Sequence, residues 1–366
     1  FQAEDGIRDA QESRGLGDVY KRQLPRRRRA AAYGEFLRSR QIDVVSAHYS
    51  LFGAAIAAEL GIPFVQTIHN AYVWLTPAQV EQLWVADAHT RAYLAVSGFA
   101  ACYADARLRL PVHKMVIVPN GIDVERLAAG RSAIDRQRRR AELGFGPSDY
   151  VFLNVGSICA QKAQVPLLRA LAQAREDNPA LVLAVLGGVS DRAYDRRLRQ
   201  EIRRLGVGPA VRLLGFHEDA SRFYALADAF VLPSYWEGCS LALAEAVCAG
   251  LPVVASDVGY AREVLSAVGG RLVSPPYDSI ADLEPGGGWS MPPEREARFV
   301  GELAVALSET AKAPRGPNLS ADLRRRLDRR HAYTAYAHVL SRLASGASPV
   351  EARQCVGGLN LRERSG

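Results

Sequence analysis

The feature that most constrains the fold of this chain is the stretch 231–263, which reads VLPSYWEGCSLALAEAVCAGLPVVASDVGYARE. The run 230–233 is short and apolar, as is typical of a strand buried in a parallel sheet. Segment 240–249 predicts a helix that begins at a serine suited to N-capping and stops at Gly250. A strand, a polar loop, a helix and a second strand therefore follow one another. In open α/β sheets ligands bind at the carboxyl ends of strands, so the loop 234–238 is a candidate site.

Two glutamates in this stretch have environments that need an explanation. Glu237 lies just before the predicted helix, where backbone N–H groups and the positive end of the helix dipole favour an anion such as a diphosphate. The helix is apolar almost all round, so Glu245 inside it needs a partner or a solvated cleft, because an unpaired buried charge costs several kcal/mol. This stretch thus has carboxylates that can accept hydrogen bonds from hydroxyl groups of a ligand, next to a site that favours an anion. A sugar nucleotide carries both kinds of group.

The rest of the chain repeats the alternation of strand and helix. Predicted strands are 43–47, 64–68, 150–155, 181–188, 211–215 and 229–233, and predicted helices include 25–40, 48–60, 131–143, 295–312 and 321–344. This alternation at the length of βα units predicts parallel, doubly wound α/β sheets. A chain of 366 residues is long enough for two domains, each with its own core.

The candidate loop also carries a family resemblance. The pattern PS-x-x-EG…EA…G-x-PVVAS…G…E, with Glu237 and Glu245 separated by seven residues, resembles the signature of the retaining GT-B glycosyltransferases of family four, or group 1. The resemblance covers roughly residues 42–344. It implies a GT-B fold, with two Rossmann-like domains facing each other across a cleft and the first domain incomplete. It also implies transfer of a sugar from a nucleotide sugar to an acceptor with retention of configuration, and the chain contains no D-x-D metal motif.

The resemblance assigns roles to individual residues. Glu237 would contact the donor sugar, and Glu245 would bind the ribose hydroxyls. His69, at the end of strand 64–68, would approach the donor sugar or the reaction centre. Lys162 would bind the donor diphosphate, beside Ser157 where the family usually has an arginine. Catalysis would thus involve Glu237, His69 and Lys162, and the donor site would be completed by Gly156, Ser157, Gly238, Cys239, Ser240 and Leu241.

Other interpretations of these residues remain open. The helix could be a capped core helix with one exposed glutamate, His69 could cap its loop, and Lys162 could be a solvated surface lysine. At the level of function, the alternatives are a catalytically silent nucleotide-sugar-binding GT-B protein and a sugar-nucleotide epimerase or dehydrogenase. A G-x-G-x-x-G after the first strand would favour a dehydrogenase, and the sequence has none there.

The same signals divide the chain into five expected segments. They are a non-native leader at 1–23, an incomplete N-terminal acceptor-side domain at 24–123, a C-terminal nucleotide-sugar-binding domain at 124–320, a helix crossing back at 321–344, and a disordered tail at 345–366. The leader has no clear amphipathic period. In the crossing helix, the spacing of Tyr333, Tyr336 and Leu340 predicts a buried stripe.

The composition limits which binding partners and which cellular location we expect. Five cysteines without a CxxC pair argue against a disulfide framework and against a zinc site, and no apolar run is long enough to span a bilayer. We therefore expect a cytoplasmic protein, with or without peripheral contact with the inner face of the membrane. The net charge of +7 comes with no nucleic-acid-binding motif. The expected partners are a nucleotide sugar and a carbohydrate or lipid-linked acceptor, with no metal and no cofactor beyond the donor.

Overall fold

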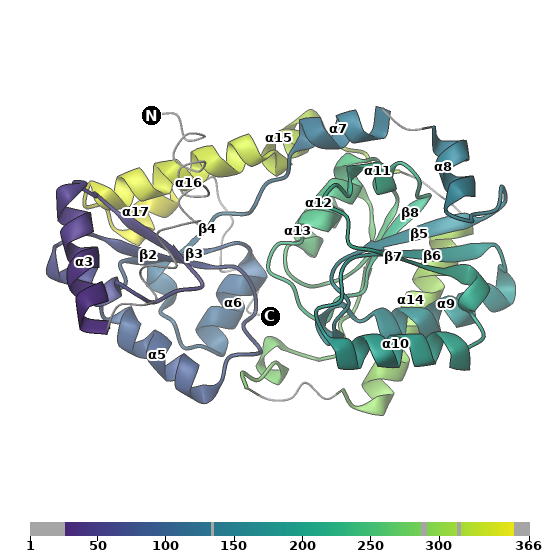
Figure 1. The fold of residues 1–366 in the computed structure, drawn as a ribbon, viewed down its shortest axis with the longest axis horizontal. Helices are drawn as coiled ribbons and strands as arrows, with labels where there is room; N and C mark the ends of the chain where they lie inside the picture. Colours follow the sequence, from purple (N-terminus) through teal and green to yellow (C-terminus); the bar gives the residue numbers. More distant parts are fainter. Residues whose placement is uncertain (1–25, 133–134, 287–290, 313–315, 355–366) are drawn as a thin grey trace.

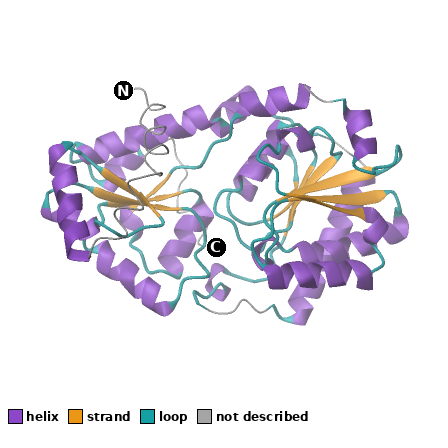
Figure 2. Cartoon of the chain, viewed as in Figure 1, coloured by secondary structure: helices purple, strands orange, loops and turns teal. Residues whose placement is uncertain are grey.

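The computed structural model describes residues 26–132, 135–286, 291–312 and 316–354, which form two α/β domains (Figure 1). Each domain holds a parallel sheet with helices on both faces, as the colours of Figure 2 show. This arrangement confirms the expected α/β architecture of doubly wound sheets.

The first domain is built on a four-stranded parallel sheet in the order β1-β2-β3-β4. Its strands are β1 (Val45–His48), β2 (Phe64–Ile68), β3 (Ala92–Ala95) and β4 (Met115–Ile117). Helix α3 (Arg26–Ser39) precedes β1, and the strands are joined through α4 (Ala54–Glu59), α5 (Pro77–Asp87) and α6 (Gly98–Ala106). Every residue of β2 is buried, as expected of a strand covered on both faces.

The second domain has a six-stranded parallel sheet in the order β10-β9-β8-β5-β6-β7. Its strands are β5 (Tyr150–Val155), β6 (Leu181–Leu186), β7 (Val211–Gly215), β8 (Ala229–Leu232), β9 (Val253–Ser256) and β10 (Arg271–Val273). Helices α9 (Gln164–Asp177), α10 (Arg192–Arg204) and α14 (Pro293–Lys312) lie below the sheet in Figure 1. Helices α11 (Ser221–Tyr224), α12 (Leu241–Cys248) and α13 (Ala261–Val268) lie on its other side.

This strand order places two loops next to each other. The chain runs from β5 outward to β6 and β7, then returns to β8 on the other side of β5 and continues to β9 and β10. The direction reverses between β5 and β8, and such a switch point opens a crevice at the carboxyl ends of the two strands. The loops 156–163 and 233–240 leave those two ends, so the topology brings together the segments that contain Lys162 and Glu237.

The two domains are connected by paired crossings of the chain. Ile122, just before α7 (Val124–Ser132), forms a β-bridge with Asp328, which separates α15 (Ala321–Leu327) from α16 (Arg329–Ala344). Helix α15 packs on the core of the second domain, whereas Val339 and Leu343 of α16 pack against the first sheet. Segment 280–286 also contacts the first domain, where the Gly286 N–H donates to the Val73 carbonyl at 2.9 Å.

The structure corrects the expected helix 48–60. His48 ends β1, and α4 begins only at Ala54. The reason is local, because Tyr49 has φ 56° and Gly53 has φ 91°, and a right-handed helix cannot continue through these values. The expected helix 131–143 is likewise wrong in its bounds, since α7 ends at Ser132 and α8 spans Arg136–Glu142.

The C-terminal region differs from the expectation in three ways. Helix 321–344 is interrupted at Asp328, whose extended backbone and side chain cap α16. Tyr333 is exposed, so the predicted stripe was wrong there, whereas Tyr336 and Leu340 are partly buried and pack against the first sheet beside the buried Val339 and Leu343. The tail is not disordered throughout, because α17 (Pro349–Arg353) forms a capped turn against β4. The expected leader 1–23 and residues 355–366 of the tail lie outside the described residues.

Among the described helices, none combines the length and the apolar character needed to cross a bilayer. The expectations of a cytoplasmic location and of peripheral membrane contact stay predictions.

Candidate active site

The centre of the candidate site is an ion pair between the two loops at the switch point. Lys162 Nζ donates to Glu237 Oε1 at 2.5 Å, and only 18% of the lysine side chain and 7% of the glutamate side chain are exposed. The lysine follows β5 and the glutamate follows β8, so their contact depends on the strand order. The structure therefore excludes the interpretation of Lys162 as a solvated surface lysine.

Neighbouring contacts hold the two loops in register. Gln161 Nε2 donates to the Trp236 carbonyl at 2.9 Å, and the Tyr235 N–H donates to the Gln161 carbonyl at 2.9 Å. Ala163, directly after Lys162, is fully buried with φ 50°. A left-handed non-glycine residue persists only where its surroundings enforce it, and such strain concentrates at functional sites. Sequence reasoning missed Gln161, because nothing local marks a glutamine that bridges two loops.

The remaining residues of the first loop lie close to this pair. A Cβ added to Gly156 would lie 3.3 Å from Lys162 Cδ, so the lysine stem runs along the glycine. The Ser157 carbonyl accepts a hydrogen bond from Gln164 Nε2 at 3.0 Å, and the Ser157 hydroxyl is 3.7 Å from Cys159 Sγ. The structure thus places Gly156 beside the Lys162 stem, whereas the contacts of Ser157 are with Gln164 and Cys159 of the same loop and helix.

Helix α12 begins beside Glu237, as the sequence predicted. Ser240 is its N-cap, and the serine hydroxyl accepts from the Leu243 N–H. The N–H groups of Leu241 and Ala242 precede the first intrahelical hydrogen bonds and can donate to an anion. The site therefore combines an ammonium group with helix N–H donors.

Glu245 lies further along α12 and has the partner that its position required. Tyr224 donates its hydroxyl to Glu245 Oε2 at 2.7 Å. Burial raises the pKa of Glu245, and the hydrogen bond from Tyr224 acts in the opposite direction. The second carboxylate oxygen of Glu245 can accept hydrogen bonds from a ligand.

The first domain meets the second at Gly238 and His69. A Cβ added to Gly238 would lie 1.8 Å from the carbonyl oxygen of His69, so only glycine fits at this contact. Cys239 is next to it, and its thiol lies 3.9 Å from the Asn120 carbonyl. The predicted residues His69, Glu237 and Gly238 thus lie at one junction between the domains.

His69 belongs to a polar network that the sequence did not reveal. His48 Nδ1 and His69 Nε2 share a hydrogen bond of 2.7 Å, and the Tyr336 hydroxyl lies 3.1 Å from His48 Nε2. Tyr336 also hydrogen-bonds the side chains of Ser46 and Thr67. These contacts join β1, β2 and α16, so His69 is oriented by its neighbours rather than acting as a simple loop cap.

This network predicts a pH dependence of stability. Burial and the neighbouring His48 lower the pKa of His69 to about 4, whereas an unfolded histidine has a pKa of about 6.5. The neutral ring is favoured in the folded state, so its contribution to stability is complete above pH 6.5 and is lost as pH falls through 4. The full shift corresponds to about 3 kcal/mol, which we reduce to about 1–2 kcal/mol because the ring is only half-buried.

Urea unfolding at pH 7 and pH 4 measures this effect. The loss of stability on acidification should be smaller in His69→Gln by that amount, while the exposed His113→Gln should lose as much as the wild type. Equal losses in His69→Gln and the wild type would show that His69 does not titrate as stated.

Two family models match the chain, one over each domain. Residues 135–284 match the model described as "Glycosyl transferases group 1". Residues 4–126 match the model described as "Glycosyltransferase Family 4". The first match contains Lys162, Glu237 and Glu245, and the second contains His48 and His69. Both parts of the chain are similar in sequence to glycosyltransferases.

Curated relatives of the chain are also named as glycosyltransferases. The D-inositol 3-phosphate glycosyltransferase of Actinosynnema mirum is 34% identical over 248 residues, which are 59% of this chain and 56% of the relative. The UDP-Gal:alpha-D-GlcNAc-diphosphoundecaprenol alpha-1,3-galactosyltransferase of Escherichia coli is 28% identical over 247 residues, which are 61% of this chain and 60% of the relative. The chain spans less than two thirds of the length of these relatives.

Solved structures establish the fold. The Anabaena protein HepE in complex with UDP-glucose superimposes with a TM-score of 0.61 at 21% identity, over 86% of this chain and 82% of that one. The sucrose-phosphate synthase of Thermosynechococcus elongatus gives a TM-score of 0.64 at 19% identity, over 88% and 81%. Together with the parallel sheets described above, these neighbours show that the chain has the GT-B fold.

Proposed function

We propose that this chain, a GT-B protein of the group 1 glycosyltransferase type, transfers a sugar from a nucleotide-sugar donor to an acceptor with retention of anomeric configuration. The observation that carries the proposal is the buried Lys162–Glu237 pair at the switch point between β5 and β8. A cation and a carboxylate held together there fit a ligand with an anionic diphosphate and a hydroxyl-bearing sugar.

The donor would be bound by groups from both loops. Lys162 and the N–H groups at the start of α12 would contact the diphosphate, which leaves Glu237 to accept hydrogen bonds from the donor sugar. Glu245, fixed by Tyr224, would accept hydrogen bonds from the ribose hydroxyls. The same groups would stabilise the negative charge that develops on the leaving nucleotide, so we propose that no metal and no further cofactor is required.

The acceptor would approach from the first domain. His69 lies at the junction beside Gly238, and its ring is neutral at pH 7, so it can hydrogen-bond an acceptor hydroxyl or the donor sugar. The names of the two relatives refer to an inositol phosphate and to a lipid-linked sugar. We propose an acceptor of this general kind, a free or lipid-linked carbohydrate.

A transfer assay tests the function. The full chain is incubated with UDP- and GDP-sugars, lipid-linked and free sugar acceptors, and EDTA, and products are followed by proton NMR of the anomeric signals. An α-linked product from an α-linked donor is expected, at a rate that EDTA does not lower. An inverted product would contradict retention, and loss of the activity in EDTA would contradict metal independence.

The same assay separates the proposal from its alternatives. Nucleotide binding with no transfer to any acceptor would favour a catalytically silent binding protein. Conversion of one nucleotide sugar into its epimer without release of the nucleotide would favour an epimerase.

A further inference from the structure

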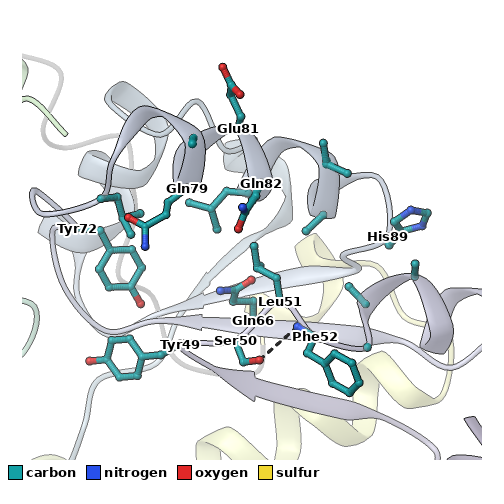
Figure 3. Close-up of a pocket in the computed structure, with 18 of the residues that line it drawn as sticks. Tyr49, Ser50, Leu51, Phe52, Gln66, Tyr72, Gln79, Glu81, Gln82 and His89 are labelled. Atoms are coloured by element: carbon teal, nitrogen blue, oxygen red, sulfur yellow. Dashed lines mark hydrogen bonds between the residues drawn. The ribbon is translucent and has the colours of Figure 1, made fainter. Parts of the chain in front are cut away.

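The first domain contains a cavity that the donor site does not use. It has a volume of about 1030 Å³ and lies between the loop after β1, strand β2 and helix α5 (Figure 3). A cavity of this size is typical of sites for small ligands. It is separate from the switch-point loops, because its lining residues all come from the first domain.

The floor of the cavity carries a buried polar group without a partner. Gln66, on β2, is 3% exposed, and its Oε1 makes no hydrogen bond within the described part of the chain. Buried carbonyl oxygens are nearly always hydrogen-bonded, so this one calls for a donor from a ligand or from water. A ligand hydroxyl can supply that donor.

The opposite wall presents a complementary donor. Gln79 Oε1 accepts hydrogen bonds from the Thr76 N–H at 2.9 Å and from the Thr76 hydroxyl at 3.1 Å. These contacts fix which end of the amide faces inward, and Figure 3 shows the Gln79 nitrogen turned toward the cavity. Gln82 also points from α5 toward the sheet. The cavity therefore offers amide donors and acceptors on two facing walls.

The mouth of the cavity is aromatic. Tyr49, Phe52 and Trp74 are large side chains that remain 67%, 46% and 50% exposed. Flat aromatic faces beside amide groups suit sugar rings, which have an apolar face and hydroxyl groups at their edges. Among the described lining residues there is no lysine or arginine, and Glu81 points away from the cavity in Figure 3. The cavity is thus unsuited to a phosphate group.

The cavity and the reaction junction share two walls. The Tyr49 ring stacks on the His69 ring with a centroid distance of 4.8 Å, and the Tyr72 hydroxyl accepts from the His69 N–H at 3.0 Å. Tyr49 and Tyr72 both line the cavity. A molecule bound there would extend from the cavity toward His69.

From these observations we infer that the cavity binds uncharged sugar rings of the acceptor, adjacent to the sugar whose hydroxyl reacts at His69. Gln66 and Gln79 would hydrogen-bond the hydroxyls, and Trp74 would stack on a ring face. This inference rests on the proposed function and specifies its acceptor as one with at least two neutral sugar units. An acyl or polyprenyl chain would leave the Gln66 oxygen unpaired.

Saturation-transfer NMR tests the inference without an activity assay. The probes are the methyl glycosides of cellobiose, lactose and chitobiose, with glucose 6-phosphate and octanol as comparison probes. We expect saturation transfer from the full chain to at least one disaccharide, and an affinity at least tenfold lower in Gln66→Leu and in Trp74→Leu. The matched control is Trp84→Leu, because Trp84 of α5 is similarly exposed but does not line the cavity.

Two further measurements separate this inference from misfolding and from failure of the proposed function. Gln66→Leu removes an unpaired buried oxygen, so its melting temperature should be at least that of the wild type while its sugar binding falls. UDP or GDP binding should be unchanged in both cavity variants. If the wild type itself binds neither nucleotide, that result contradicts the proposed function and not the binding of sugars in the cavity. Three results would overturn the inference. The first is a disaccharide affinity in both variants equal to that of the wild type. The others are preferential binding of octanol or glucose 6-phosphate over the disaccharides, and the absence of disaccharide binding by the wild type.

Discussion

Replacing Lys162 with methionine is expected to destabilise the second domain by about 3 kcal/mol and to abolish measurable nucleotide-sugar binding. The Glu237 side chain is 7% exposed, and the substitution leaves its carboxylate without the ammonium group that now lies 2.5 Å away. Removing one partner of a buried ion pair costs about 3–5 kcal/mol, and the partial exposure of Lys162 places our expectation at the lower end. The same change removes the cation proposed to contact the diphosphate.

A double-mutant cycle separates these two effects. Combining Lys162→Met with Glu237→Gln removes both charges, so urea unfolding should recover most of the lost stability. Nucleotide-sugar binding should not recover, because the cation is still missing. Lys312→Met, at an exposed position near the end of α14, serves as the control and should match the wild type in both measurements. Wild-type stability and affinity in Lys162→Met would contradict our account of the pair.

Replacing Gly238 with alanine is expected to lower the transfer rate about a hundredfold. The new Cβ would lie 1.8 Å from the His69 carbonyl oxygen and 2.7 Å from its carbon. These atoms belong to the backbone, so no side-chain rotation relieves the overlap, and the domains must move apart at the point where His69 meets the donor loop. A misplacement of about 1 Å at a reacting centre can cost a hundredfold in rate.

The control for this variant is Gly301→Ala, because an added Cβ at Gly301 in α14 meets nothing within 4 Å. Transfer rates and small-angle X-ray scattering are compared for both variants. Gly238→Ala should be slower and more extended, whereas Gly301→Ala should resemble the wild type. An active, compact Gly238→Ala protein would show that the junction is not needed for transfer.

The second domain was largely predictable from its sequence. Its strands β6, β8 and β9 are short apolar runs buried throughout, and β5 and β7 have the predicted bounds. The capped start of α12 was also visible, because Ser240 and Gly250 are local signals. A parallel sheet then places the loops after its strands at one edge, which is why Lys162 and Glu237 could be assigned to one site.

The site in the first domain was only partly predictable. His69 was identified at the end of a strand, but its partner His48 was assigned to a helix that does not form there. Tyr336 was placed in a buried stripe, yet its hydroxyl bonds His48, 288 residues earlier in the chain. Such a contact depends on how α16 docks on the first sheet, and no local spacing encodes it. The Tyr224–Glu245 hydrogen bond was missed for the same reason.

The measurement that tests the central claim most directly is calorimetric binding of UDP and GDP to the full chain, beside the Glu245→Ala variant. Our account predicts that one nucleotide binds and that the variant binds it about 2 kcal/mol more weakly, because hydrogen bonds from ribose hydroxyls to a carboxylate are lost. A folded wild type that binds neither nucleotide, or a Glu245→Ala variant with unchanged affinity, would contradict the assignment of the donor site.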